Sequence, residues 1–468
     1  MRRFLSLKCR NVVIIVSITM FMIQLDASVL AIALPEIARD FGVPLVSLSL
    51  AITIYLTMLV ACLPLSGWAA DRFGPKRVML VSIMGFGGFS ILCALVGNYW
   101  VFIACRAVMG FCASLLTPVG RLLLLKQADK SELVDALAII AMPMLIAPTI
   151  GPSIGGFIVQ HARWEYIFLL NVPVGLALFL LTRSLVLEVP PDRERRLDWI
   201  GAGLVAGTLI ALLAGIDRLA SGVEKPLPWL SIAGGILLAI WTVKHVRCHP
   251  YPIVSFAALA NPAFRTTVIG AGAVVRLPAR ALLFILPLMF QGGFGFDPLV
   301  AGLLLMALNG GDLVSKPLVV RAYDRIGFRR TVFFGSLAGL LALSAIALVD
   351  RGRNAITIIV AALFVAGVVR SIVFTGMSSL TFITLDKQTL SSGNVVANIS
   401  MQLFNALAVS ITALILSLSV WSHGRTDPVI ADYRFALWVI LAIGLVSTLA
   451  LWRQIPDRLS DIHADESG

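Results

Sequence analysis

Eight ionisable side chains stand inside long apolar runs of this sequence, where charge-dependent chemistry would be concentrated. A charged group at the centre of a membrane costs about 2.5 to 3.5 kcal/mol on insertion scales, so each needs a reason to be there. Carboxylates and arginines in such places hold protons, pair with one another or bind charged ligands. Two of the eight lie near the ends of their runs, where they can extend to the interface. The eight are Asp26, Arg106, Arg276, Arg280, Asp312, Arg370 and, near the run ends, Arg121 and Lys316.

Asp26 and Arg106 are predicted to lie at nearly the same depth in the membrane. Asp26 lies eight residues before Leu34, at the outer end of its predicted helix, and Arg106 lies six residues after Trp100, at the outer end of another. With a rise of about 1.5 Å per residue, their depths are ~12 and ~9 Å. Two interpretations stay open: a structural ion pair, or a carboxylate that alternates between pairing with arginine and holding a proton.

The second half of the sequence carries its own set of charges. Counted from the outer ends of their helices, Arg276, Asp312 and Arg370 lie ~21, ~20 and ~21 Å deep. Asp312 can neutralise one arginine of the set, which includes Arg280, so at least one positive charge remains in excess. This excess predicts a cavity that tolerates anionic or neutral amphipathic ligands better than polyvalent cations. Arginines that serve only packing are the alternative.

Amide side chains form a further group of candidates. Asn398, Gln402 and Asn405 are spaced by four and three residues, which places them on one face of a helix. Exposure of that face to lipid would be costly, so it is predicted to point inward, where it lines a ligand path or bridges helices. Gln24, two residues before Asp26, is a further cavity candidate.

The stretch APTIGPSIGG at residues 147 to 156 combines small residues with prolines. Gly151, Gly155 and Gly156 allow another helix to approach closely. Pro152 removes a backbone donor and bends its own helix. The stretch therefore predicts a helix that seals closely against a neighbour.

All of these residues require membrane-spanning helices to position them. Of the 468 residues, 59% are hydrophobic and 13% are charged, and the mean hydropathy is +0.95, which is outside the range of a soluble domain. Fourteen apolar stretches are long enough as helices to cross a hydrocarbon layer of ~30 Å. The expected fold class is an all-α polytopic membrane protein with spans near residues 11–34, 47–69, 78–97, 100–125, 133–160, 165–188, 197–216, 228–246, 266–290, 298–320, 331–349, 354–384, 393–421 and 433–453.

The basic residues predict a topology rather than a nucleic-acid partner. With the N-terminus inside, cytoplasmic segments hold 23 of the 37 lysines and arginines, outer loops hold 8 and the spans hold 6. This asymmetry follows the positive-inside rule and puts both termini in the cytoplasm. Five histidines lie in predicted loops or the tail, and six cysteines lack a CxxC spacing. We therefore expect no metal, no cofactor and no membrane redox enzyme.

A loop pattern occurs twice, as DRFGPKRV at residues 71 to 78 and as DRIGFRRT at residues 324 to 331. Positive-inside charge explains its basic residues but not the aspartate and glycine that recur in register. Two duplicated six-helix halves would place the copies about 200 residues apart, and their spacing leaves about 50 residues for an inserted helix pair. We predict a six-helix bundle over 1–188, the inserted pair with its linkers over 189–250, and a second six-helix bundle with a tail over 251–468.

Several motifs together resemble the fourteen-helix drug:proton antiporter branch of the major facilitator superfamily, in particular its MdtD-like members. They are GWAADRFGPKR after the second span, LDASVLAIALP at residues 25–35, RAVMG at 106–110, the glycine stretch at 147–156, and RWEYIFLLNVPVG at 163–175, which we interpret as structural. The resemblance covers the whole chain. It departs at Met109, where glutamine is usual, at Pro75, where a basic residue is usual, and at Ala147, where glycine is common. Met109 removes any hydrogen bond that the glutamine would make.

The resemblance implies how such a chain works. In this superfamily two six-helix bundles rock around a central site, and the first and fourth spans line one cavity. Asp26 and Arg106 would then couple proton uptake to substrate release. The glycine stretch resembles the motif of exporters, which favours export over uptake.

The resemblance also implies that the two repeated loops are latches between the cytoplasmic ends of the bundles. A helix N-terminus carries partial positive charge, so Asp71 is expected beside the helix that Ser391 or Ser392 caps. By duplication, Asp324 is expected beside the helix that Ser131 caps. The latch residues are Gly67, Asp71, Arg72, Gly74, Lys76, Arg77, Asp324, Arg325, Gly327, Arg329 and Arg330.

These observations lead us to expect a proton-coupled antiporter that exports drugs or amphipathic small molecules across a bacterial cytoplasmic (inner) membrane. A facilitative or proton-coupled transporter of one metabolite on the same fold is the first alternative. A proton-pumping membrane subunit is the second, although no row of buried lysine, glutamate and histidine supports it. The expected partners are a small-molecule substrate, protons and the lipid bilayer. We expect a monomer with no nucleic acid and no enzymatic activity.

Overall fold

Helices make up every regular element in the part of the chain that the computed structural model describes. The described residues are 6–127, 133–188, 190, 198–219, 226–249, 254–350, 352, 354–383, 385, 390–425 and 427–454. The chain divides into two units, Met1–Ile253 and Val254–Gly468. Each unit holds its own helices and its own buried charges.

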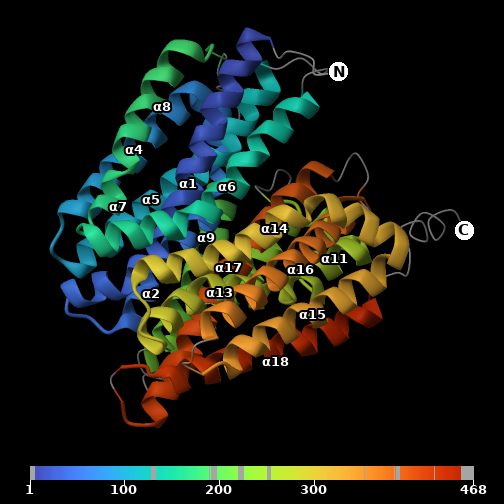
Figure 1. Ribbon diagram of the computed structural model, residues 1–468. Helices are drawn as coiled ribbons and strands as arrows, with labels where there is room; N and C mark the ends of the chain where they lie inside the picture. The colour runs from blue at the N-terminus through green and yellow to red at the C-terminus, as the bar shows by residue number, and fades with distance from the viewer. Residues whose placement is uncertain are drawn as a thin grey trace, which may run out of the picture. The chain divides into compact units, whose positions relative to one another are not determined.

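The first unit contains ten α-helices, and their bounds follow the apolar runs of the sequence (Figure 1). The second predicted span is broken after Cys62 because Pro64 cannot donate a backbone hydrogen bond. The helices are α1 (Leu7–Asp40), α2 (Ser49–Cys62), α3 (Leu65–Phe73), α4 (Pro75–Leu95), α5 (Tyr99–Gln127), α6 (Leu133–His161), α7 (Tyr166–Leu169), α8 (Asn171–Leu185), α9 (Trp199–Leu219) and α10 (Pro226–Cys248).

The second unit contains eight α-helices. The span predicted as continuous over 266–290 is broken into three helices and a π-helical turn, Met289–Gly293. Gly270 takes an extended conformation with φ −81° and ψ −152°, and this ends the first piece. The helices are α11 (Pro262–Val268), α12 (Ala271–Val274), α13 (Arg276–Leu288), α14 (Pro298–Ile326), α15 (Phe328–Leu348), α16 (Ala355–Ile383), α17 (Leu390–Ser422) and α18 (Ile430–Gln454).

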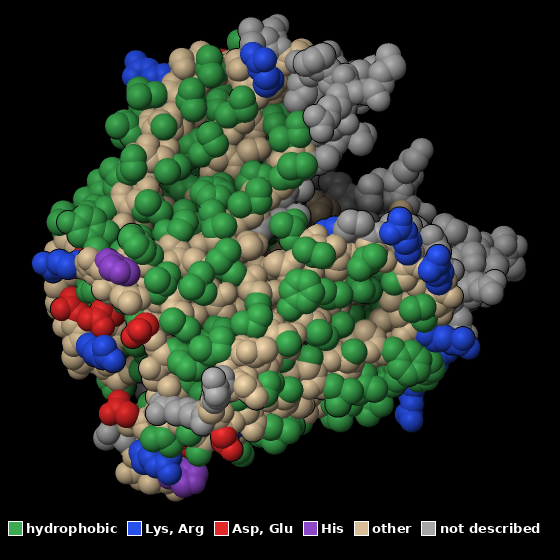
Figure 2. All heavy atoms as spheres, viewed as in Figure 1, with side chains coloured by type: hydrophobic (Ala, Val, Ile, Leu, Met, Phe, Trp, Pro, Cys, Tyr) green, Lys and Arg blue, Asp and Glu red, His purple; other side chains and the backbone are tan. Residues whose placement is uncertain are grey.

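Thirteen helical segments among the described residues are long and apolar enough to cross a membrane. Each coincides with a predicted span, and α6 covers the remaining one, predicted over 133–160. Large apolar side chains point outward from these helices, such as Phe334, Leu341 and Leu348 on α15, whose exposed fractions are 56% to 69%. Figure 2 shows such side chains covering α15 and α18. These faces suit a hydrocarbon solvent.

Glycines bring certain helices into close contact within each unit. A Cβ atom on Gly110 of α5 would lie 2.3 Å from the backbone oxygen of Tyr55 on α2. In the second unit, a Cβ atom on Gly367 of α16 would lie 1.9 Å from the backbone oxygen of Leu308 on α14. Only glycine permits these approaches, which place the arginines of α5 and α16 beside their partners.

The predicted inserted pair corresponds to α9 and α10, which pack against each other and belong to the first unit. Gly215 of α9 approaches Ile232 of α10, and Gly235 of α10 approaches Leu212 of α9. Helix α9 also contacts α2. The pair is therefore anchored to the first bundle through α9.

Candidate functional site

A buried ion pair joins α1 to α5 in the first unit. Arg106 donates from a terminal nitrogen to Asp26 Oδ2 at 2.8 Å, and the two side chains are 1% and 0% exposed. The structure thus brings together the two residues that the depth estimate placed at one level. Gln24, the neighbouring cavity candidate, is half-buried on α1.

Asn171, at the start of α8, completes the binding of Asp26. Its amide nitrogen donates to Asp26 Oδ1 at 3.0 Å and lies 3.1 Å from Ser90 Oγ on α4. Ser90 in turn donates to the backbone oxygen of Phe168 at 2.8 Å. Each carboxylate oxygen of Asp26 therefore has a donor. Asn171 belongs to the stretch RWEYIFLLNVPVG, interpreted from the sequence as structural; its contact with Asp26 was not predicted, although this motif was a signal that could have indicated it.

The remaining surroundings of Arg106 are aromatic rings and weak acceptors. Its guanidinium carbon lies 4.6 Å from the ring centroid of Tyr55 and 5.8 Å from that of Phe168. Its Nε donates to the backbone oxygen of Ala51 at 3.4 Å. Met109 Sδ lies 3.8 Å from the same nitrogen that binds Asp26. The hydrogen bond expected to be lost at position 109 is thus replaced by a weaker contact to sulfur.

The glycine stretch of α6 packs against α1 close to Asp26. A Cβ atom on Gly151 would lie 2.0 Å from Ser28 Oγ, and one on Gly155 would lie 2.9 Å from the backbone oxygen of Val29. Pro152 and Gly156 are buried within the same helix. The stretch therefore contacts α1 within one turn of the buried carboxylate.

In the second unit, Asp312 of α14 pairs with Arg370 of α16. Arg370 donates from one terminal nitrogen to Asp312 Oδ2 at 3.1 Å and to Asn309 Oδ1 at 3.0 Å. Lys316 Nζ lies 3.2 Å from Asp312 Oδ1. The structure thus selects Arg370 among the three candidate partners. Lys316, predicted to extend to the interface, is 38% exposed and also pairs with this carboxylate four residues earlier on the same helix.

Arg276 and Arg280 of α13 line a separate pocket of about 370 Å³. Nε and one terminal nitrogen of Arg276 are buried without a hydrogen-bond partner among the described residues. The Arg280 guanidinium lies 5.8 Å from the ring centroid of Phe374. The pocket thus carries two guanidinium groups, and the rest of its lining is Ala273, Phe374, Ser378, Ser400, Met401, Phe404 and Asn405.

The three amides of α17 do not act as one group. Asn405 lines the pocket and donates to Gln402 Oε1 at 2.7 Å. Asn398 donates to the backbone and side-chain oxygens of Asn394, at 2.8 and 3.0 Å. These bonds run along α17, and only Asn405 joins the pocket lining.

The two repeated loops have the same backbone geometry. Gly74 ends α3 with φ 88° and ψ 133°, and Gly327 ends α14 with φ 88° and ψ 159°. Glycine adopts this conformation without the steric cost that other residues meet, which explains why it recurs in both copies. Arg329 lies over the ring of Trp452, 4.3 Å from its centroid. Asp71 and Lys76 are half-buried, and the basic residues Arg72, Arg77, Arg325 and Arg330 are exposed.

The contacts expected for the two latches involve residues or side chains that the structure does not describe. Ser131 lies outside the described residues, as do the side chains of Asp324, Ser391 and Ser392. Gly67 is exposed and meets no neighbour within 4 Å of an added Cβ. The latch assignment therefore stays a prediction.

Comparison with known proteins identifies the family. The sequence profile of the Major Facilitator Superfamily matches residues 16–274 and 268–467. The chain is 30% identical over 443 residues to the probable transport protein HsrA of Haemophilus influenzae, covering 94% of this chain and 95% of the relative. This chain belongs to the major facilitator superfamily. It is also 28% identical to the putative multidrug resistance protein MdtD of Enterobacter sp., with 95% and 94% coverage, and to that of Klebsiella pneumoniae, with the same coverage.

Solved structures of other transporters have the same fold. A D-xylose-proton symporter matches with a TM-score of 0.66 at 12% identity, covering 96% of this chain and 98% of the symporter. A POT family transporter in complex with 5-aminolevulinic acid matches with a TM-score of 0.67 at 13% identity, covering 95% of each chain. Membership in this superfamily makes the chain a multi-pass membrane transporter rather than an enzyme.

Proposed function

We propose that this transporter is a proton-driven antiporter that exports amphipathic small molecules from the bacterial cytoplasm. The observation that carries the proposal is the enclosed Asp26 carboxylate, bound by Arg106 and Asn171 and fully removed from the surface. Intramembrane carboxylates serve as members of proton relays in pumps and transporters.

Protonation of Asp26 changes the charge balance of the first unit. The neutral acid no longer compensates Arg106, and a buried cation without its partner is strongly destabilised. Contacts with the rings of Tyr55 and Phe168 and with the oxygen of Ala51 replace only part of the lost attraction. A conformation that gives Arg106 another environment is then favoured, so proton binding shifts the equilibrium between conformations.

The pocket of the second unit supports the substrate class. Arg276 and Arg280 supply two positive charges, and Phe374 and Phe404 supply apolar surface. An amphipathic molecule with an anionic group fits both features, because charge-assisted hydrogen bonds would satisfy the unpartnered nitrogens of Arg276. Polyvalent organic cations would be repelled.

The direction of transport is supported by the glycine stretch of α6 and by the MdtD relatives, whose name describes multidrug resistance. A facilitative or proton-coupled transporter of one metabolite is the second candidate, because a D-xylose-proton symporter has the same fold. Close packing of α6 on α1 limits leakage beside the proton site, and the resemblance of its glycine stretch to the motif of exporters favours export.

We further propose an inner-membrane location with both termini in the cytoplasm, and a chain that works as a monomer. The asymmetry of basic residues supports this orientation. The two glycine-containing loops would act as cytoplasmic latches, and α9 with α10 would be an accessory pair outside the two six-helix bundles.

Transport by inverted membrane vesicles under an imposed pH gradient tests the coupling. Asp26→Asn should abolish pH-driven substrate accumulation while leaving counterflow exchange of substrate measurable. Glu36→Gln is the matched control, because Glu36 lies on the same helix, has a side chain that is 47% exposed, and pairs with Arg39. Full pH-driven accumulation by Asp26→Asn would sink the proposal.

A further inference from the structure

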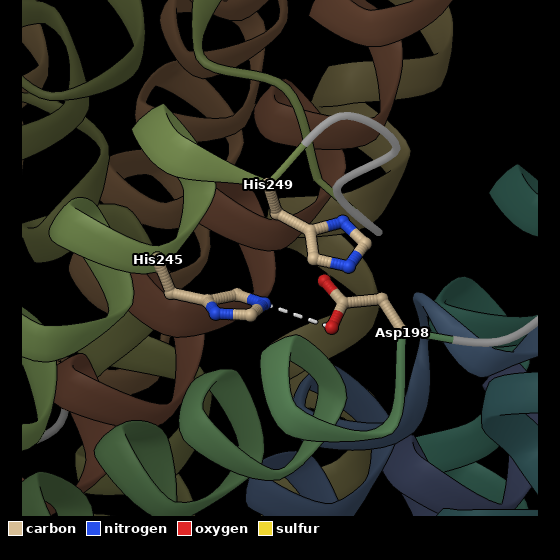
Figure 3. A group of neighbouring side chains, drawn as sticks. All are labelled: Asp198, His245 and His249. Atoms are coloured by element: carbon tan, nitrogen blue, oxygen red, sulfur yellow. Dashed lines mark hydrogen bonds and ion pairs between the residues drawn. The ribbon is translucent and has the colours of Figure 1, made fainter.

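Three potential metal ligands meet where α9 begins and α10 ends (Figure 3). Asp198 lies immediately before α9, His245 lies in the last turn of α10, and His249 follows that helix. The expectation that all five histidines lie in loops or the tail is therefore wrong for His245. Their ligand atoms all lie within 4.8 Å of one another. Asp198 and His245 are 47 residues apart in sequence, so no short motif reveals the cluster.

The helix start positions the carboxylate. Asp198 Oδ1 accepts from the backbone nitrogen of Gly201 at 2.8 Å, and a Cβ atom at Gly201 would lie 2.1 Å from Asp198 Oδ2. Glycine at 201 therefore lets the carboxylate fold over the first turn of α9. A hydrogen bond of this kind commonly orients a ligating carboxylate.

The end of α10 positions the two imidazoles. His245 and His249 are four residues apart, a spacing that puts both on one face, and their ring centroids are 5.0 Å apart. His245 Nε2 already lies 2.8 Å from Asp198 Oδ1. Figure 3 shows the ring of His249 above the other carboxylate oxygen. Asp198 is buried and both histidines are half-buried, so the cluster is shielded but reachable.

We propose that Asp198, His245 and His249 bind a divalent transition metal of the zinc class. Two imidazole nitrogens and one carboxylate oxygen suit a borderline ion such as Zn²⁺ or Co²⁺ and leave a fourth position for water. Ligand atoms on a tetrahedral ion with bonds of ~2.1 Å lie about 3.4 Å apart, so rotation of the imidazoles is enough to close the site. His245 then binds through Nε2 and carries its proton on Nδ1.

The metal would fasten the start of α9 to the end of α10. The two helices already pack through their glycines and through a hydroxyl contact of 3.2 Å between Thr208 and Thr242. Metal binding is therefore not needed to form the pair. It would instead hold together the two points where this helix pair connects to the rest of the chain. The metal site is separate from the Asp26–Arg106 pair and from the pocket lined by Arg276.

Zinc binding by the full-length protein, purified in detergent without a histidine tag, tests the site. After treatment with a chelator and equilibration with Zn²⁺, elemental analysis should find about one zinc per chain. Co²⁺ should give the visible absorption of a tetrahedral site. His249→Ala should lower the affinity at least tenfold. This variant keeps the bond between His245 and Asp198, so the pair is expected to fold.

His161→Ala is the matched control, because His161 ends α6, stacks on Phe157 and is not one of the three clustered ligands. It should bind zinc as the unaltered protein does. Gly201→Ala should weaken zinc binding by displacing the carboxylate while leaving all three ligands in place. Absence of zinc from the unaltered protein, or equal zinc in the His249→Ala variant, overturns the proposal.

Discussion

Each unit of the molecule holds one arginine–carboxylate pair, but the two pairs have different surroundings. In the first unit, Asp26 and Arg106 are fully buried, and Asn171 binds the second carboxylate oxygen. In the second unit, Asp312 is 21% exposed and holds both Arg370 and Lys316. The first pair is balanced in charge and fully buried, whereas the second has more positive than negative charge.

The scaffold around the two pairs is alike, so the difference lies in the side chains. Gly110 lets α5 approach α2, and Gly367 lets α16 approach α14. Both arginines lie within four residues of these glycines. The close helix contacts thus recur in both units, while Arg276 and Arg280 are two further cations that line a pocket in the second unit. Under the proposed function, a buried neutral pair suits proton exchange, and a positive pocket suits an anionic group.

The largest effect should come from breaking the first pair. Arg106→Gln leaves Asp26 buried without its cation and should cost about 3 to 5 kcal/mol of stability. The double variant Asp26→Asn, Arg106→Gln removes both charges and should recover most of that stability without recovering pH-driven transport. Thermal unfolding in detergent and vesicle transport measure the two outcomes separately. Recovery of transport by the double variant would mean that the pair is purely structural.

Removing a cation from the second unit should change substrate choice instead of coupling. Arg276→Gln should lower the transport of an anionic amphiphile about tenfold, the equivalent of one charge-assisted hydrogen bond, with a small effect on proton coupling. Competition assays with matched anionic and cationic dyes measure this. Arg265→Gln is the control, because Arg265 is exposed on α11. An equal loss for both dyes would contradict the assignment of the pocket.

Breaking the second pair should cost less than breaking the first. Asp312→Asn leaves Arg370, whose side chain is 12% exposed, bound to Asn309, so the expected loss of stability is about 1 to 3 kcal/mol, smaller than for the first pair. Affinity for anionic amphiphiles should rise, because Arg280 and Arg370 lose a nearby negative charge. Parallel thermal unfolding of Asp312→Asn and Asp26→Asn tests the difference. A larger loss for Asp312→Asn would reverse the comparison.

Sequence alone predicted the spans and the levels of the charged residues. A helix has a fixed rise, so counting residues from the span ends put Asp26 level with Arg106, and Asp312 level with Arg370. Both pairs form in the structure. Counting worked because these four residues lie on helices that are continuous between the outer end and the charge.

Counting gave the depth of a residue but not its partner. Arg276 was placed level with Asp312, and its helix α13 is continuous from Arg276 to Leu288, yet it is Arg370 that donates to Asp312. Asn171 reaches Asp26 from α8, and His245 reaches Asp198 from α10. Such contacts depend on which helices are neighbours and on how each is rotated, and hydropathy carries neither kind of information.

The smallest effect is expected at Met109, where the first pair touches its weakest acceptor. Met109 Sδ lies 3.8 Å from the Arg106 nitrogen that also binds Asp26. Glutamine has nearly the same length, and its amide oxygen is a better acceptor than sulfur. Met109→Gln should therefore strengthen the contact with Arg106 by about 0.5 to 1.5 kcal/mol at most, as one additional hydrogen bond.

That contact would compete with Asp26 for the same guanidinium. A second acceptor makes Arg106 less dependent on the carboxylate, so protonation of Asp26 should leave the cation better compensated and drive the conformational change less strongly. Met109→Gln should then keep its stability but need a slightly larger pH gradient for half-maximal accumulation in vesicles. Met109→Leu, which has no acceptor, is the control and should shift the gradient in the opposite direction. If both variants needed the same pH gradient for half-maximal accumulation, residue 109 would have no part in proton coupling.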